Sequence, residues 1–212
     1  MDFTTVLLLI GFIIVAVYFT IKMRQVRKLQ QQAREKYAAD LKKYKTLTSE
    51  QFDTISVSEL TNAVLFHIMG KEDSLYEGET ISDEDVYDLL SDGERMIYAI
   101  YQVEISLRSG RSGSLHSFFI EDRYAKYRSY AQQAFRDIGC ADIADLIKAA
   151  ARLAQIIEED LDDEENDIEE KYASYNFADY TKTLTAMMKT SGVVKKAGKY
   201  IKNHKSMFID QP

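Results

Sequence analysis

The chain has 212 residues, of which 46% are hydrophobic and 29% are charged, with one Pro, one Cys and no Trp. These values exclude a disulfide-stabilised scaffold, a collagen-like or Pro-rich chain and a wholly disordered chain. The formal net charge is −7, from 27 Lys and Arg against 34 Asp and Glu. The length predicts one domain with a hydrophobic core and flanking extensions.

The first predicted element is an apolar run over residues 3–21, nineteen residues without a charged side chain. A run of this length can cross the hydrocarbon core of a bilayer as a helix. A cleaved signal peptide would need positive charge before the run and small residues at a cleavage site after it. The only preceding charge is Asp2, and the run ends in Tyr18-Phe19-Thr20-Ile21. The sequence therefore predicts an uncleaved transmembrane anchor over residues 1–21, with the lipid bilayer as a partner.

A basic segment follows the apolar run, with nine bases and two acids between residues 22 and 45. Because positive residues next to a span favour the cytoplasmic side, the N-terminus is predicted to lie outside and the rest of the chain in the cytoplasm. The expected location is the bacterial inner membrane, as a single-pass protein. Apolar residues recur every three or four positions from Val26 to Tyr44, which predicts a basic juxtamembrane helix over residues 22–47.

The remainder of the chain is predicted to be all-helical, because Pro212 is its only proline and alternating strand patterns are scarce. Helices are expected over residues 48–69, after Ser82, from Glu94 to a Gly/Ser loop at 109–114, over 115–138, from Asp142, and over 178–188. The predicted fold class is all-α: a single N-terminal transmembrane helix followed by a helical-bundle domain. The domain is placed at residues 48–190, and residues 191–212 are expected to form a flexible basic tail.

Charge is arranged in blocks. Residues 46–181 carry 30 acids and 11 bases, whereas residues 182–212 carry seven Lys and one Asp. Ten acids and no base lie in residues 72–94, and ten more acids lie in residues 158–170. Such blocks suit divalent cations, imitation of a phosphate backbone, or another basic partner. The possible acidic partner surface comprises Glu158, Glu159, Asp160, Asp162, Asp163, Glu164 and Glu165.

Metal, cofactor and catalytic sites are not predicted. The second acidic block lacks the glycine that a helix–loop–helix calcium site requires at its sixth position. His67 and His204 have no Cys or His at metal-ligand spacing and are interpreted as ordinary side chains. His116 stands beside Ser114 and Ser117, but neighbouring helical residues do not face each other, so no catalytic triad is argued.

Several aromatic residues between Phe118 and Phe135 are assigned to the core by their helical spacing. Direct nucleic-acid binding is not expected, because the domain is acidic. Glu104 lies on an otherwise apolar face, and a structural role is favoured for it: receiving backbone amides of the Gly/Ser turn, or pairing with Arg123 or Arg128.

Residues 90–100 (LSDGERMIYAI), then Glu104, Phe118-Phe119 and residues 134–139 (AFRDIG) resemble an uncharacterised bacterial helical domain family that includes a DNA-mimic protein. The similarity covers residues 90–154, within a family-like core over residues 90–157. In that family a helix-ending Glu precedes a glycine turn and a Gln-Phe-Phe element, and here the turn is longer. The resemblance implies structural or turn roles for Glu104, Gly110, Gly113, Phe118, Phe119 and Gly139.

Two functions are therefore predicted. The first is a membrane-anchored cytoplasmic protein-interaction module without catalytic activity, whose partner and oligomeric state the sequence does not identify. The alternative is a DNA-mimic or immunity-type inhibitor that presents carboxylates to a basic DNA-binding or nuclease protein. A hydrolase ranks third and would require a pocket in which Glu104 and His116 converge. Raising the ionic strength distinguishes the first two functions, because an electrostatic mimic then loses its partner and an apolar contact does not.

Overall fold

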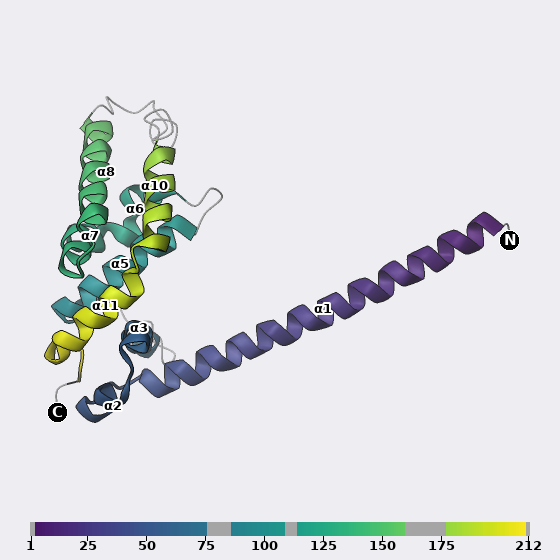
Figure 1. The fold of residues 1–212 in the computed structure, drawn as a ribbon, viewed down its shortest axis with the longest axis horizontal. Helices are drawn as coiled ribbons and strands as arrows, with labels where there is room; N and C mark the ends of the chain where they lie inside the picture. The colour runs from purple at the N-terminus through teal and green to yellow at the C-terminus, as the bar shows by residue number, and fades with distance from the viewer. Residues whose placement is uncertain (1–2, 76–85, 109–113, 160–176, 211–212) are drawn as a thin grey trace. The chain divides into compact units, whose positions relative to one another are not determined.

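The protein is helical throughout the part that the computed structural model describes, which is residues 3–75, 86–108, 114–159 and 177–210 (Figure 1). Within these ranges there is no β-strand, which confirms the all-α prediction. The chain forms two compact units, Met1–Lys43 and Tyr44–Pro212.

The first unit consists of a single helix, α1 (Phe3–Tyr44), which contains both the apolar run and the basic segment without a break. Several of its apolar side chains are exposed, among them Phe12, Phe19 and Leu29. No helix in the described part of the chain combines the length and apolarity that crossing a membrane requires. This finding contradicts the predicted single-pass, N-out localisation, and the transmembrane helix of the predicted fold is likewise unsupported.

The second unit begins with two helices where the sequence predicts one. Helix α2 (Ser49–Thr54) starts at Thr48, whose side chain accepts a hydrogen bond from the Gln51 amide while Gln51 accepts one from the Thr48 amide. Ile55 is extended and ends α2, and α3 (Val57–Leu75) follows. Helix α3 continues through Gly70, beyond the predicted end at residue 69, and Gly70 packs against the backbone of Lys45, where an added Cβ would lie 3.2 Å from Lys45 Cα.

Four further described helices and a 3-10 turn form the middle of the domain: α4 (Val86–Leu89), α5 (Asp92–Arg108), α6 (Leu115–Ile120), η1 (Asp122–Tyr124) and α7 (Ala125–Asp137). The predicted start of a helix at Ser82 lies outside the described residues. The predicted helix over residues 115–138 is interrupted at Glu121, which is extended. Arg128 stabilises this corner by donating to the carbonyl oxygens of Phe118 and Glu121, at 2.8 and 2.9 Å. Gly139, with φ +79°, ends the α7 region as predicted.

The domain is completed by α8 (Ala141–Glu159), α10 (Phe177–Thr190), α11 (Val193–Asn203) and η2 (Lys205–Met207). Helix α5 packs on α7, α7 on α8, and α8 on α10, so that α8 and α10 lie side by side (Figure 1). Helix α11 packs closely against α3, which joins the C-terminal part of the chain to the start of the domain.

Residues 193–203 form a docked helix where the sequence predicts a flexible tail. Val193, Ala197 and Ile201 recur at a four-residue spacing and are buried, whereas the lysines between them face outward or lie at the edge. Beyond the helix, Phe208 is almost fully buried, and the Asp210 amide donates to the Leu47 carbonyl oxygen at 3.1 Å. The lysine-rich composition predicts exposure of the lysines, but the apolar stripe between them determines that the segment folds.

The core contains the aromatic residues that the sequence assigns to it. Phe118, Tyr124 and Phe135 are fully buried, and Tyr127 is nearly so. Tyr127 makes edge-to-face contacts with Tyr87 and Tyr98, at centroid distances of 5.4 and 5.2 Å. These rings come from α4, α5 and α7, pack against one another, and are not free to stack on nucleic-acid bases.

Alkaline pH should destabilise the domain through Tyr98. Burial, and next the negative charge of Glu72, raises the pKa of Tyr98 far above its ordinary value. Since the unfolded chain releases this proton near pH 10, the stability that the neutral phenol contributes is complete below that pH and is lost above it. We expect the free energy of unfolding to fall between about pH 10 and pH 11.5, and to fall less steeply in Tyr98→Phe. Urea titrations over this range check the result. The half-buried Tyr180→Phe is the control, and equal slopes for the wild type and Tyr98→Phe would contradict the prediction.

Candidate protein-interaction surface

The predicted acidic partner surface begins at the end of α8. Glu159 is exposed in the last turn of this helix, and Glu158 lies beside it in the chain. The other predicted members, Asp160 and residues 162–165, lie outside the described residues. The structure therefore places the base of this acidic block at the end of α8, next to α10.

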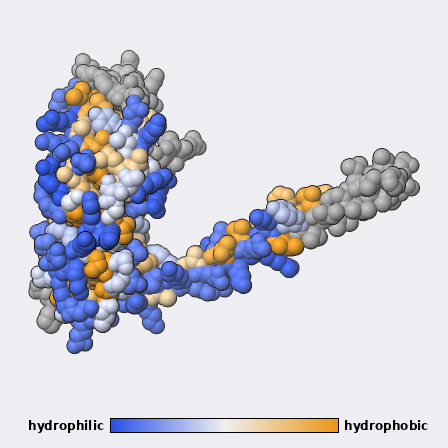
Figure 2. Space-filling view, viewed as in Figure 1, coloured by the Kyte–Doolittle hydropathy of each residue, from blue (hydrophilic) through white to orange (hydrophobic). Residues whose placement is uncertain are grey.

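Six solvent-accessible carboxylates in the described part of the domain pair with a base. Arg95 pairs with Asp92 at 3.2 Å, and Arg136 pairs with Asp145 at 2.7 Å. The same holds for Asp53, Asp88, Glu104 and Glu121, whose partners are Lys205, Lys126, Arg108 and Arg123. Pairing of this kind cancels local charge even though each exposed pair contributes little stability. The visible face in Figure 2 accordingly carries polar residues across most of the domain, with smaller apolar areas between them.

The excess negative charge of the domain is concentrated in two segments. From residue 44 onward, the described residues carry 18 acids and 17 bases and are nearly neutral. Residues 76–85 and 160–176 together carry 13 acids and a single base, Lys171. The first segment joins α3 to α4, and the second joins α8 to α10. The acidic character expected of the whole domain thus belongs to these two connections.

The residues predicted for structural or turn roles are distributed over the fold. Phe118 and Phe119 are buried in α6, and their rings make an edge-to-face contact at 5.5 Å. Gly110 and Gly113 lie outside the described residues. The side chain of Glu104 is 33% exposed and pairs with Arg108 one turn further along α5, not with Arg123 or Arg128. His116 stands on a different helix, α6.

A different glutamate, Glu94, is the buried carboxylate among the described residues of the domain. Its side chain is 2% exposed and lies at the start of α5. Lys71 Nζ donates to its two oxygens at 2.7 and 2.9 Å, and the Ser91 amide donates to Oε2 at 2.8 Å. The Glu94 amide in turn donates to the Ser91 hydroxyl at 3.2 Å, which completes a reciprocal cap. Each oxygen of this carboxylate is therefore satisfied, as burial of a charge requires.

His67, which is also 2% exposed, connects Glu94 to the C-terminal end of the chain. Its Nε2 lies 3.4 Å from Glu94 Oε1 and 3.3 Å from Asp210 Oδ1, and its Nδ1 lies 3.1 Å from the carbonyl oxygens of Tyr44 and Lys45. All four neighbours are acceptors. Among the described side chains, no group of three or more His, Cys, Asp or Glu is arranged to hold a metal ion.

The C-terminal lysines are anchored on α2. Lys205 Nζ lies 2.7 Å from Asp53 Oδ2, and Lys202 Nζ lies 4.0 Å from Asp53 Oδ1. The hydrogen bond from Lys205 lowers the pKa of Asp53. Both ammonium groups also lie over the ring of Phe52: Lys202 Nζ is 5.4 Å and Lys205 Nζ is 5.6 Å from the ring centroid. The basic end of the chain is thus attached to the domain and is partly neutralised by it.

Residues 88–204 match the family model described as DMP19-like protein. This range covers more than half of the chain. The chain belongs to the DMP19-like protein family. The resemblance that residues 90–154 carry to a helical family that includes a DNA-mimic protein is thereby confirmed, and the family region extends beyond it through α10 and α11. No curated protein and no solved structure matches the chain.

The DMP19-like region contains a signal for Glu94 that the sequence analysis missed. Ser91 and Glu94 have the spacing of a capping box immediately before the apolar residues of α5. That pattern predicts a helix start, but it does not predict the burial of the carboxylate. Burial depends on His67, Lys71 and Asp210, which lie far from Glu94 in the sequence.

Proposed function

We propose that this protein is a binding protein without catalytic activity that presents carboxylates to a basic, DNA-binding protein. The observation that carries the proposal is membership of the DMP19-like family over residues 88–204. The resemblance of residues 90–154 is to a family that includes a DNA mimic, and such a role requires many negative charges that are not neutralised by the protein itself.

The distribution of charge supports this proposal and assigns it to particular segments. B-DNA offers its partners one negative charge per roughly 1.7 Å of helix axis. The described surface is a poor substitute, because its 18 acids are nearly balanced by 17 bases. Residues 76–85 and 160–176 hold 13 acids against one base, so a basic partner would be attracted to these two segments.

The test is capture of a partner by the full-length chain from native cell extract, followed by competition with DNA. We expect a basic DNA-binding protein that is retained at low salt and released at high salt, because the contact is electrostatic. The purified partner should bind duplex DNA, and this protein should displace the DNA with an affinity that falls about tenfold or more between roughly 50 and 200 mM salt. Fluorescence anisotropy of labelled DNA measures both the binding of DNA to the partner and the displacement of that DNA by this protein.

Charge-neutral variants locate the surface. We expect replacement of the acids of residues 158–170 by Asn and Gln to weaken competition about tenfold or more. Replacing Asp92 and Asp145 by Asn, which removes acids already paired with Arg95 and Arg136, should change competition less than about twofold. A partner that stays bound at high salt, or that binds this protein and DNA at the same time, would contradict the mimic function. It would favour an interaction module that uses an apolar contact.

A further inference from the structure

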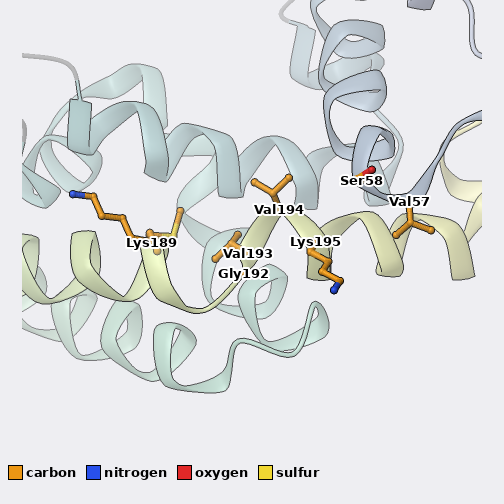
Figure 3. Close-up of a pocket in the computed structure, with 8 residues that line it drawn as sticks. Val57, Ser58, Lys189, Gly192, Val193, Val194 and Lys195 are labelled. Carbon is orange, nitrogen blue, oxygen red and sulfur yellow. The ribbon is translucent and has the colours of Figure 1, made fainter.

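A groove lies at the corner between α10 and α11, away from the two acidic segments in the sequence. Its volume is about 730 Å³, within the range of small-ligand and peptide sites. The start of α3 contributes Val57 and Ser58, and the α10–α11 corner contributes the other lining residues, which are Met188, Lys189, Gly192, Val193, Val194 and Lys195 (Figure 3).

The walls of this groove are fixed by close contacts between α3 and α11. The Thr61 hydroxyl donates to the Val194 carbonyl oxygen at 2.9 Å. Gly198 approaches α3 so closely that an added Cβ would lie 2.1 Å from the Val57 carbonyl oxygen. A groove held in this way exists before a ligand arrives, which reduces the entropy that binding costs.

The lining combines apolar side chains with positive charge and contains no carboxylate. Val194 lines the groove and is 51% exposed. Lys189 and Lys195 are exposed on either side of Val193 and Val194 (Figure 3). No carboxylate among the described residues lies within ion-pair distance of either lysine. Although the chain has a net charge of −7, the groove is locally positive, and this local charge selects a negatively charged ligand.

We propose that this groove binds an acidic peptide segment of a partner protein, with one apolar side chain of the peptide on Val194 and Met188 and its carboxylates on Lys189 and Lys195. Charge complementarity identifies the ligand as an anion, and the apolar lining distinguishes a peptide from a nucleic-acid backbone, whose phosphates and sugars offer no aliphatic side chain. The protein then has two interaction surfaces of opposite sign. Acidic connections attract a basic partner, and this groove receives an acidic one.

The test uses the full-length chain and a fluorescein-labelled peptide, Asp-Glu-Leu-Glu-Asp-Asp, a sequence that does not occur in the chain. We expect binding at low salt, with a dissociation constant on the order of 100 μM or tighter. Lys189→Glu combined with Lys195→Glu should weaken it at least about tenfold, and Val194→Asn about fivefold. Lys148→Glu combined with Arg152→Glu makes the same change in net charge on exposed positions of α8, and it should alter binding less than about twofold.

A second readout keeps the proposal independent of folding defects in the variants. In amide NMR spectra of the wild-type chain, the peptide should shift the signals of Val193 and Val194 and leave those of Lys148 and Arg152 unchanged. Absence of peptide binding at low salt would overturn the proposal, and so would equal weakening by the α8 control. Tighter binding of a short DNA duplex than of the peptide would also overturn it, in favour of a phosphate-binding surface.

Discussion

Gly198→Ala should destabilise the domain by about 3 kcal/mol or more, a large effect for a single added methyl group. The new Cβ would lie 2.1 Å from the Val57 carbonyl oxygen and 3.2 Å from the Val57 carbonyl carbon. Both neighbours are backbone atoms, so no side chain can rotate away, and α3 and α11 must separate. In a solvent-exposed helix the same substitution would be stabilising, because alanine has the higher helix propensity. A loss of stability in Gly198→Ala would therefore show that Gly198 of α11 contacts Val57 of α3.

Urea unfolding followed by circular dichroism measures this loss. Lys199→Ala, which changes the next and exposed position of α11, should stay within about 0.5 kcal/mol of the wild type. A stabilised Gly198→Ala variant would mean that α11 does not dock on α3 as described. Because Thr61 and Val194 belong to the same contact, a destabilised variant should also weaken peptide binding in the groove.

Helical content was predictable from the sequence, but the helix breaks were not. Scarce glycine and proline and the three-to-four-residue apolar spacing identify α5, α7, α8 and α10. The breaks at Ile55 and Glu121 occur at residues that have no helix-breaking character of their own. At Ile55 the backbone turns extended and its amide donates to the Phe52 carbonyl oxygen, and the corner at Glu121 is held by the two carbonyl contacts of Arg128. Such contacts depend on the tertiary position of the side chain, which a periodic pattern does not contain.

The two ends of the chain show how composition can mislead. The nineteen-residue apolar run predicts a membrane span, yet no described helix satisfies the requirements for one. An apolar run indicates that its side chains avoid water and does not specify which surface covers them. At the other end, the lysine-rich composition of residues 191–212 predicts a flexible tail. There, Val193, Ala197 and Ile201 are sufficient to dock α11 on the domain.

Burial of charge was the least predictable property of the candidate sites. Sequence reasoning singled out Glu104, because its helical neighbours are apolar, and it passed over Glu94, which is flanked by Gly93 and Arg95. In the structure Glu104 reaches solvent beside Arg108, whereas Glu94 lies beneath Lys71, His67 and Asp210. Lys71 and His67 come from α3, and Asp210, which contacts His67, comes from the C-terminal end, so only the folded chain brings them together.

Glu94→Gln should lower the free energy of unfolding by about 3 kcal/mol. The substitution keeps the shape of the side chain and removes its charge. It also places an amide NH2 group among donors, namely Lys71 Nζ and the Ser91 amide, so one buried donor loses its acceptor. Glu104→Gln is the matched control. It removes the same charge from a partly exposed pair and should cost less than about 0.5 kcal/mol.

A double-mutant cycle with Lys71→Met separates the contribution of the ion pair from that of His67. If Lys71 is the principal partner, Glu94→Gln should cost about 1–3 kcal/mol less in the Lys71→Met background than in the wild type. If the two changes are additive, the carboxylate is held mainly by His67 and the Ser91 amide, and the cluster serves to attach the C-terminal end through Asp210. Equal losses for Glu94→Gln and Glu104→Gln would contradict the burial of Glu94 itself. The cycle thus tests whether a charge that the sequence left unnoticed connects α3, α5 and the end of the chain.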